Sequence, residues 1–160
     1  MELTVARLKE RLKYDPDTGL FTWIMSPNWS IKVGSIAGSY KDEYVRITID
    51  GKPYLAHRLA WFYQTNTWPK DEIDHKDLNK HNNEWSNLRP ATKQQNRYNT
   101  LPHSNNTLGL KGVSLHSCGK FQAAIRVNKK KIYLGLYSTS CEASKAYQKA
   151  LTKYAGEYAR

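Results

Sequence analysis

Residues 73–99 constrain the fold of this chain most, because several short segments follow one another there with little room between them. The sequence Ile-Asp-His at 73–75 predicts the start of a strand, and residues 76–83 form a polar loop rich in Asn, Asp and Lys. Leu88 and Arg89 predict the returning strand. We therefore expect a β-hairpin with a long polar loop.

A short helix is expected directly after this hairpin. Thr92 is a favourable N-cap residue, and Gln95 stands three positions later, which completes a capping box. The helix should run from about residue 93 to residue 98 or beyond. The segment as a whole therefore predicts strand, loop, strand and helix in fewer than about thirty residues.

The pair Asp74-His75 at the end of the first strand is the first candidate for chemistry. Neighbouring side chains of a strand point to opposite faces, but at a strand end both can reach one cleft. A carboxylate binds a hard cation such as Mg²⁺ or Mn²⁺, and a neutral imidazole can take a proton from water. Phosphodiester hydrolysis needs both functions. An isolated Asp-His pair is more often an ordinary surface feature, so it needs support from its neighbours.

Two asparagines add that support. Asn87 can clamp the loop by hydrogen bonds from its side chain to the backbone. Asn96 would lie in the first turns of the capped helix and can face the hairpin, where its amide oxygen is a second hard metal ligand. Arg89 is a candidate phosphate contact, with a salt bridge inside the hairpin as an equal alternative. Lys93 can contact DNA from the helix, but a solvated helix face is the preferred interpretation.

The first seventy residues predict a scaffold of short elements. Leu3, Leu8 and Leu12 lie close to helical spacing, and the turn at residues 14–19 should end that helix. Strands are expected at residues 20–24, 44–49 and 53–55, the last two joined by an Asp-Gly turn, and a helix at residues 57–64. His57 is interpreted as structural and His81 as loop surface.

The last sixty residues predict a linker at 101–108 and then a sheet covered by a helix. The alternating runs suggest an antiparallel sheet with strands at 111–115, 121–127 and 132–136. Thr139 and Glu142 form a second capping box. The helix after it should pack on the sheet through a stripe made of Ala143, Ala146, Tyr147, Ala150, Leu151 and Tyr154.

Positive charge is concentrated in the same region. The chain has a net charge of +11, of which residues 1–100 carry +3 (15 Lys/Arg against 12 Asp/Glu) and residues 101–160 carry +8 (10 against 2). Such a surface attracts phosphate chains, although a solubilising surface is an equally ordinary explanation. Cys118 and Cys141 form no ligand cluster, so neither a disulfide framework nor a structural zinc site is expected. Without an apolar signal core or a membrane-length segment, we expect a soluble, intracellular protein.

Residues 73–99 resemble the HNH endonuclease motif of phage and intron-encoded nucleases through DHKDLNKHNN, NLRPAT and QQNRYN. The upstream stretches YDPDTGLFTW and HRLAWFYQTNTWP also resemble phage HNH proteins. The resemblance implies that His75 is the general base, Asp74 the first metal ligand and Asn96 the second. It implies that Asn87 is the central asparagine, which orients the loop.

The last of these positions is His in many members of the family, and here it is Asn96. An oxygen ligand favours a single Mg²⁺ or Mn²⁺ over zinc. The resemblance further implies cleavage of double-stranded DNA to a 5′-phosphate and a 3′-hydroxyl, by a phage-encoded protein in the cytoplasm of a bacterial host. Nicking as a monomer and double-strand cutting as a homodimer both stay open, and no obligate protein partner is evident.

Residues 109–156 resemble an Apetala2/ERF DNA-binding domain through KGV, GKFQAAIR, YLG and CEASKAY. That family lays its three-stranded sheet in the major groove. The positions that match its DNA-contacting set are Lys111, Ser114, His116, Arg126, Lys131 and Tyr133. Ser114 and Cys118 stand at positions where the plant factors have Arg or Trp, and Ala124 replaces a Glu. The loss of side chains that recognise bases implies less base-specific recognition and more contact with phosphates. Phe121, Ile125 and Leu134 are expected in the core.

The sequence therefore predicts an α+β protein in two parts. A ββα-metal nuclease unit on an N-terminal α/β scaffold occupies residues 1–100, residues 101–108 are a linker, and residues 109–160 form the sheet-and-helix DNA-binding domain. The predicted function is a metal-dependent DNA endonuclease of the phage or homing type. A DNA-binding regulator with a catalytically silent nuclease fold, and an HNH toxin or RNase, are the rival classes.

Overall fold

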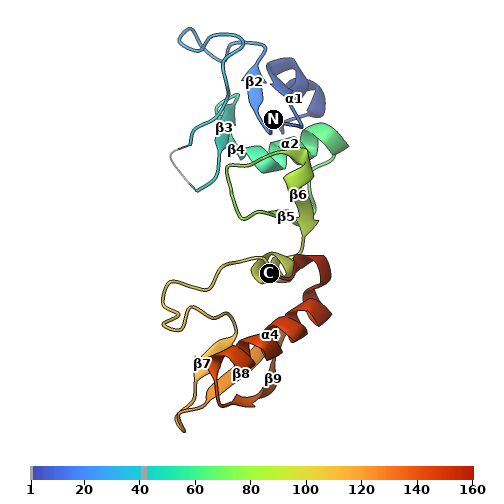
Figure 1. Cartoon of the computed structure of the whole chain (residues 1–160). Helices are drawn as coiled ribbons and strands as arrows, with labels where there is room; N and C mark the ends of the chain where they lie inside the picture. Colours follow the sequence, from blue (N-terminus) through green and yellow to red (C-terminus); the bar gives the residue numbers. More distant parts are fainter. Residues whose placement is uncertain (1, 41–42) are drawn as a thin grey trace. The chain divides into compact units, whose positions relative to one another are not determined.

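The computed structural model describes residues 2–40 and 43–160, and the chain forms two compact units (Figure 1). Unit 1 is Met1–Ala91 and unit 2 is Thr92–Arg160. The fold is α+β, as predicted, with small antiparallel sheets in both units. Among the described residues, no helix combines the length and the apolar character that crossing a membrane requires.

In its described residues, 2–40 and 43–91, unit 1 contains two α-helices, three two-stranded antiparallel sheets and one 3-10 turn. In chain order these are α1 (Val5–Arg11), β1 (Leu12–Tyr14), β2 (Phe21–Trp23), β3 (Arg46–Ile49), β4 (Lys52–Leu55), α2 (Ala56–Thr65), β5 (Glu72–His75), η1 (Trp85–Asn87) and β6 (Leu88–Ala91). The predicted Asp-Gly hairpin joins β3 to β4, and the strand, loop and returning strand of the 73–99 segment are present as β5 and β6.

The first helix is shorter than its leucine spacing predicted. Thr4 caps α1 by accepting from the Arg7 amide, and the helix ends at Arg11. Leu12 is fully buried in β1, opposite Trp23 of β2. The prediction that Leu12 belongs to the helix is wrong, because pairing with a strand further along the chain buries Leu12 in an extended conformation.

One apolar core holds the candidate hairpin to the scaffold. It includes Leu8 of α1, Phe21 of β2, Ile47 of β3 and Leu59 of α2, all nearly inaccessible to solvent. The hairpin adds Ile73 and Leu88 to the same core. Burying such side chains stabilises the fold by about 1.5–3 kcal/mol each, so the hairpin is a fixed part of unit 1.

Unit 2 begins with a short helix and continues with a sheet that one long helix covers. Its elements are α3 (Lys93–Tyr98), β7 (Val113–Leu115), β8 (Phe121–Val127), β9 (Lys130–Tyr137), α4 (Ser140–Ala155) and η2 (Gly156–Tyr158). The sheet is antiparallel in the order β7-β8-β9, and both predicted capping boxes are present at α3 and α4. Residues 101–108 contain no helix or strand.

The predicted stripe of α4 packs on the sheet except at its end. Ala143, Tyr147 and Leu151 are buried, but Tyr154 is 39% exposed and Ala155 is buried instead. Tyr154 was therefore wrongly placed in the core. Helix α4 also contacts α3 and η2. A pattern that assumes packing against the sheet alone therefore does not predict which side chains of its last turn are buried.

Helix α3 is fastened to the sheet of unit 2. The Tyr98 hydroxyl donates to the Arg126 carbonyl at 2.9 Å, and the Asn128 amide donates to Gln94 Oε1 at 2.7 Å. The Lys111 ammonium donates to the carbonyls of Tyr98 and Thr100. The two compact units therefore divide after residue 91, before α3. The predicted nuclease domain at residues 1–100 and DNA-binding domain at residues 109–160 were defined by sequence resemblance, and those bounds stay a prediction.

Candidate functional site

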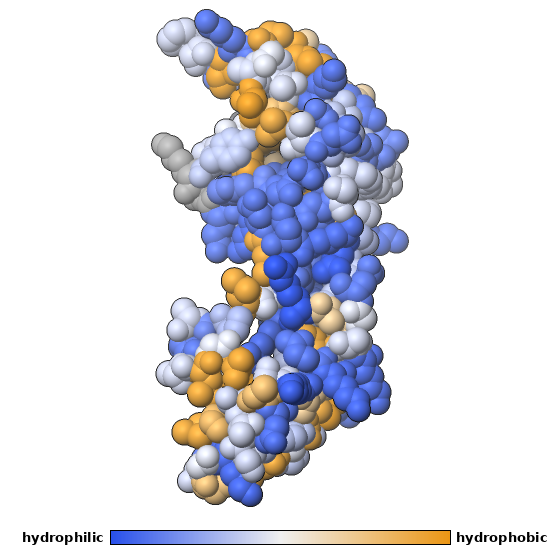
Figure 2. Space-filling model, viewed as in Figure 1, coloured by the Kyte–Doolittle hydropathy of each residue, from blue (hydrophilic) through white to orange (hydrophobic). Residues whose placement is uncertain are grey.

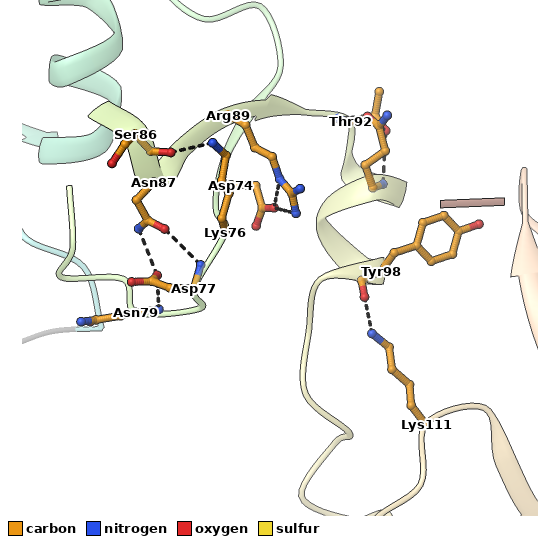
Figure 3. A network of polar contacts seen from close by, with 11 residues as sticks. Asp74, Lys76, Asp77, Asn79, Ser86, Asn87, Arg89, Thr92, Tyr98 and Lys111 are labelled. Carbon is orange, nitrogen blue, oxygen red and sulfur yellow. Dashed lines mark hydrogen bonds and ion pairs between the residues drawn. The ribbon is translucent and has the colours of Figure 1, made fainter. Parts of the chain in front are cut away.

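Asp74 and His75 end strand β5 and are both buried, at 3% and 4% exposure. Asp74 lies opposite Arg89 of β6, and its Oδ2 accepts from Arg89 Nε at 2.9 Å and Nη2 at 2.8 Å (Figure 3). A forked pair of this kind fixes the direction of a carboxylate. Of the two interpretations of Arg89, the salt bridge inside the hairpin is present, and a phosphate contact stays a prediction.

Asn87 clamps the loop between the two strands (Figure 3). Its amide nitrogen donates to Asp77 Oδ1 at 3.0 Å and to the Asn82 carbonyl at 2.8 Å, and its oxygen accepts from the Asp77 amide at 3.1 Å. The clamp expected from the sequence is therefore present as hydrogen bonds. Burial raises the pKa of Asp77, but bonds from Asn82, the Asn79 amide and Asn87 outweigh it and keep that pKa below its ordinary value.

The imidazole of His75 has a defined neighbour inside the loop. His75 Nε2 lies 3.2 Å from Asn83 Oδ1, and Asn83 is itself buried. Burial lowers the pKa of His75 below its ordinary value, more than the bond to Asn83 raises it. A neutral imidazole results near neutral pH, and that is the form that can accept a proton.

A second histidine lies beside the first. The ring centroids of His57, in α2, and His75 are 5.0 Å apart, and the Tyr44 ring lies 5.2 Å from His57. Burial, together with the neighbouring His75 and Arg58, lowers the pKa of His57 to about 3. His57 is buried, in keeping with the structural role assigned to it, but its contact with His75 was not foreseen.

Asn96 lies on α3, in unit 2, so its part in a site with Asp74 stays a prediction. In the part of the chain that the structure describes, no three or more His, Cys, Asp or Glu side chains form a group that could hold a metal ion. Lys93, also on α3, is exposed, and exposed His81 makes an edge contact with the Tyr40 ring at 5.8 Å.

The sheet of unit 2 has one covered and one open face. Val113 and Ala123 pack against Ala143 of α4 on the covered face, with Phe121 and Leu134 beside them, as expected for core residues. Alternation then places Ser114 on the opposite face. Across the strands of that open face, Ser114 pairs with Gln122, Ala124 with Tyr133, and Arg126 with Lys131.

Four of the six predicted DNA-contacting residues therefore share the open sheet face, namely Ser114, Arg126, Lys131 and Tyr133. Tyr133 is 58% exposed. Figure 2 shows hydrophobic and hydrophilic residues side by side on the visible surface of unit 2, in its lower part. His116 follows β7 and is exposed. Lys111 differs, because its ammonium bonds to two carbonyls within unit 2 and burial lowers its pKa to about 8.

A basic pocket of about 470 Å³ adjoins this face. Lys93 and Arg97 of α3 line it together with Arg126 and Lys129. Sequence reasoning missed Arg97 and Lys129, although Arg97 stands four residues after Lys93 on α3 and Lys129 stands three residues after Arg126. The four side chains gather positive charge where a phosphate chain could lie.

Comparison with known proteins gives two different matches. Residues 54–98 match the family model described as HNH endonuclease. A stretch of 51 residues is 43% identical to APETALA2-like protein 2 from both the indica and the japonica subspecies of Oryza sativa. It covers 31% of this chain but only 12% of the rice protein. No solved structure gives a significant match. The chain thus combines a segment that matches the HNH endonuclease family with a stretch similar to an APETALA2-like protein.

Proposed function

We propose that this protein is a metal-dependent DNA endonuclease of the HNH type. The observation that carries the proposal is the buried Asp74-His75 pair at the end of β5, inside the segment that matches the HNH endonuclease family. Burying a charged and a titratable side chain costs free energy, so two adjacent ones held by specific hydrogen bonds indicate a functional site.

His75 is the general base of the proposed reaction. Its imidazole is neutral near neutral pH, since burial lowers its pKa, and it can take a proton from the attacking water. Asn87 holds the loop that carries Asp77 and Asn83 beside the base, so it is a positioning residue for the same step. The products would be a 5′-phosphate and a 3′-hydroxyl.

The residue types that the proposal names as metal ligands are oxygen donors. Asp74 supplies a carboxylate whose direction Arg89 fixes, and the resemblance to the HNH motif assigns the second ligand to the amide oxygen of Asn96. Oxygen donors favour Mg²⁺ or Mn²⁺, with DNA phosphate and water in the other positions. When bound, such an ion offsets the negative charge that develops on the phosphate and the leaving oxygen.

We propose that unit 2 supplies affinity for double-stranded DNA. The support is the basic composition of residues 101–160, the open sheet face and the similarity to an APETALA2-like protein. Arg126, Lys131 and Tyr133 would contact the DNA from that face, with Ser114 and His116 at its edge. Lys111 would act mainly by holding α3 to the sheet, given its internal hydrogen bonds.

Plasmid cleavage tests the proposal. Wild-type protein is incubated with supercoiled plasmid and a phage-genome fragment, with Mg²⁺ or Mn²⁺ and with EDTA. His75→Ala is the test variant, and His81→Ala, which removes an exposed histidine of the same loop, is the matched control. We expect cleavage by the wild type and His81→Ala only, and none in EDTA.

Two other results would change the assignment. Cleavage by His75→Ala at the wild-type rate would place the active site elsewhere. Tight DNA binding without any cleavage, reduced by Arg126→Ala, would favour a DNA-binding regulator with a silent nuclease fold. The ratio of nicked to linear product would separate nicking from double-strand cutting, which bears on monomeric or dimeric action by a phage or homing enzyme.

A further inference from the structure

We propose that Asn83 is a positioning residue that fixes the proton of neutral His75 on Nε2, which makes Nδ1 the atom that accepts the proton from water. The inference rests on the proposed function for its catalytic meaning. Its structural part, the tautomer of His75, stands on its own and can be measured without DNA.

The orientation of the Asn83 amide carries the argument. Asn83 Nδ2 donates to the His81 carbonyl at 3.1 Å, so its Oδ1 is the atom that faces His75 Nε2 at 3.2 Å. An amide oxygen only accepts hydrogen bonds, and so Nε2 must carry the hydrogen. A neutral imidazole has a single ring N–H, which leaves the lone pair on Nδ1.

Neighbouring rings keep His75 in this orientation. The His57 ring meets it at a centroid distance of 5.0 Å and an interplanar angle of 77°, and the Tyr44 ring lies 6.2 Å away. Turning the imidazole over about Cβ–Cγ would replace Nε2 by a carbon at Asn83 and leave the buried amide oxygen without its donor. The packing therefore fixes the plane of the ring, and the hydrogen bond to Asn83 selects which edge of the ring faces the amide oxygen.

The N-terminal turn holds Asn83 itself in place. The Tyr14 hydroxyl donates to the Asn83 carbonyl at 2.7 Å, and the Trp85 amide donates to the Pro16 carbonyl at 2.9 Å. Gly19 has a φ of +70°, and a Cβ there would overlap the backbone of Asn83 and Glu84. The turn at residues 14–19 thus packs directly against the backbone of Asn83, the residue whose side chain orients His75.

The other asparagines of the loop bond differently. Asn82 donates to Asp77 Oδ2 at 2.9 Å and accepts from the Glu84 amide at 3.1 Å, and Asn79 accepts from the His81 amide. These bonds involve carboxylate and backbone groups, whereas Asn83 also bonds to the imidazole. Asn82→Ala is therefore a matched control, because it removes an amide from the same loop without touching the bond to His75.

The test is long-range ¹H–¹⁵N NMR of the histidine rings at about pH 8, where the two nitrogens of a neutral imidazole have distinct shifts. His75 is assigned by the signal absent from His75→Ala. We expect the Nε2-protonated tautomer in the wild type, in Asn82→Ala and in Asn83→Asp, whose carboxylate still accepts from Nε2. We expect a mixture or the Nδ1-protonated form in Asn83→Ala, with the other histidine signals unchanged.

Either an Nδ1-protonated His75 in the wild type, or an unchanged tautomer in Asn83→Ala, overturns the inference. If Asn83→Ala disturbs all histidine signals through unfolding, Tyr14→Phe replaces it and should weaken the preference for the Nε2 form; no change in that variant also overturns the inference. Under saturating DNA, we expect Asn83→Ala to cleave about 10²-fold more slowly than Asn82→Ala, with KM unchanged. Failure of the wild type to cleave DNA would refute the proposed function and leave the tautomer result intact.

Discussion

The loop between β5 and β6 and the open face of the sheet in unit 2 use polar residues in opposite ways. At the end of β5 and in the loop that follows it, Asp74, His75, Asn83 and Asn87 are buried and bond to neighbouring protein groups. On the sheet, the strands turn residues such as Arg126 and Tyr133 towards solvent. The first arrangement fixes atoms in place, whereas the second offers charge and surface to a partner.

This difference has an energetic consequence. Removing one member of a buried hydrogen-bonded set leaves its partners desolvated, which costs about 1–3 kcal/mol per group and more for charges. Removing an exposed cation leaves the fold almost unchanged and alters binding instead. Substitutions of these buried residues should therefore affect stability and catalysis together, and those on the sheet face should affect affinity alone.

The largest expected effect comes from Asp74→Ala. Arg89 is mostly buried and would lose the carboxylate with which it pairs, so we expect the free energy of unfolding to fall by about 3–5 kcal/mol, together with loss of cleavage. Urea denaturation followed by circular dichroism measures the first effect. The double variant Asp74→Leu/Arg89→Leu should recover much of the stability but no cleavage. A single variant as stable as the wild type would show that the pair does not hold the hairpin.

Asn87→Ala should have a smaller effect on stability and a clear effect on the reaction. The substitution removes three hydrogen bonds of the loop clamp, and we expect a loss of about 1–3 kcal/mol in the free energy of unfolding. Hydrogen exchange should show faster opening of residues 76–87 in this variant. Unchanged exchange in that loop would contradict the role given to Asn87.

Because of His57, we expect the free energy of unfolding to change with pH by about 1 kcal/mol. Its pKa in the folded protein is about 3 because of burial, below the ordinary value of 6.5, so the unfolded chain binds more protons between these values. Stability from this group is complete above about pH 6.5 and is lost as the pH falls. Between pH 7 and 5.5 the wild type should lose about 1 kcal/mol more than His57→Phe. Parallel stability curves for the two proteins would contradict this.

Of the four substitutions, the one on the sheet face should change stability least, but it should measurably weaken DNA binding. We expect Arg126→Ala to unfold within about 0.5 kcal/mol of the wild type. Its affinity for DNA should fall severalfold, and the slope of log affinity against log salt should decrease by about 1. Fluorescence anisotropy at several salt concentrations measures both. An unchanged salt slope would remove Arg126 from the phosphate contacts.

Local signals allowed most of the fold to be predicted. The capping boxes at Thr92 and Thr139 and the Asp-Gly turn between β3 and β4 depend on residues within a few positions of one another, and all three are present. Leu12 was assigned to the wrong element because its conformation depends on pairing with Trp23, and Tyr154 because contacts of α4 beyond the sheet decide its last turn.

The candidate site was only partly visible in the sequence. Asp74 and His75 stand out as a pair, but nothing local distinguishes Asn83 from Asn79 or Asn82 in a loop so rich in asparagine. The contact between His57 and His75 joins positions far apart in the sequence, so the spacing of apolar residues along the chain does not predict it. Such contacts follow only from the packing of α2 against the hairpin.

In the proposed mechanism, different residues of the chain supply the chemistry and the affinity for DNA. Single-turnover cleavage rates and dissociation constants, measured on the same DNA with Mg²⁺ or Mn²⁺, test it for His75→Ala and for the double variant Arg126→Ala/Lys131→Ala. We predict that His75→Ala binds like the wild type and cleaves about 10²–10⁴-fold more slowly, while the double variant binds more weakly but cleaves at the wild-type rate once saturated. Normal cleavage by His75→Ala, or a reduced saturated rate in the double variant, would contradict the account.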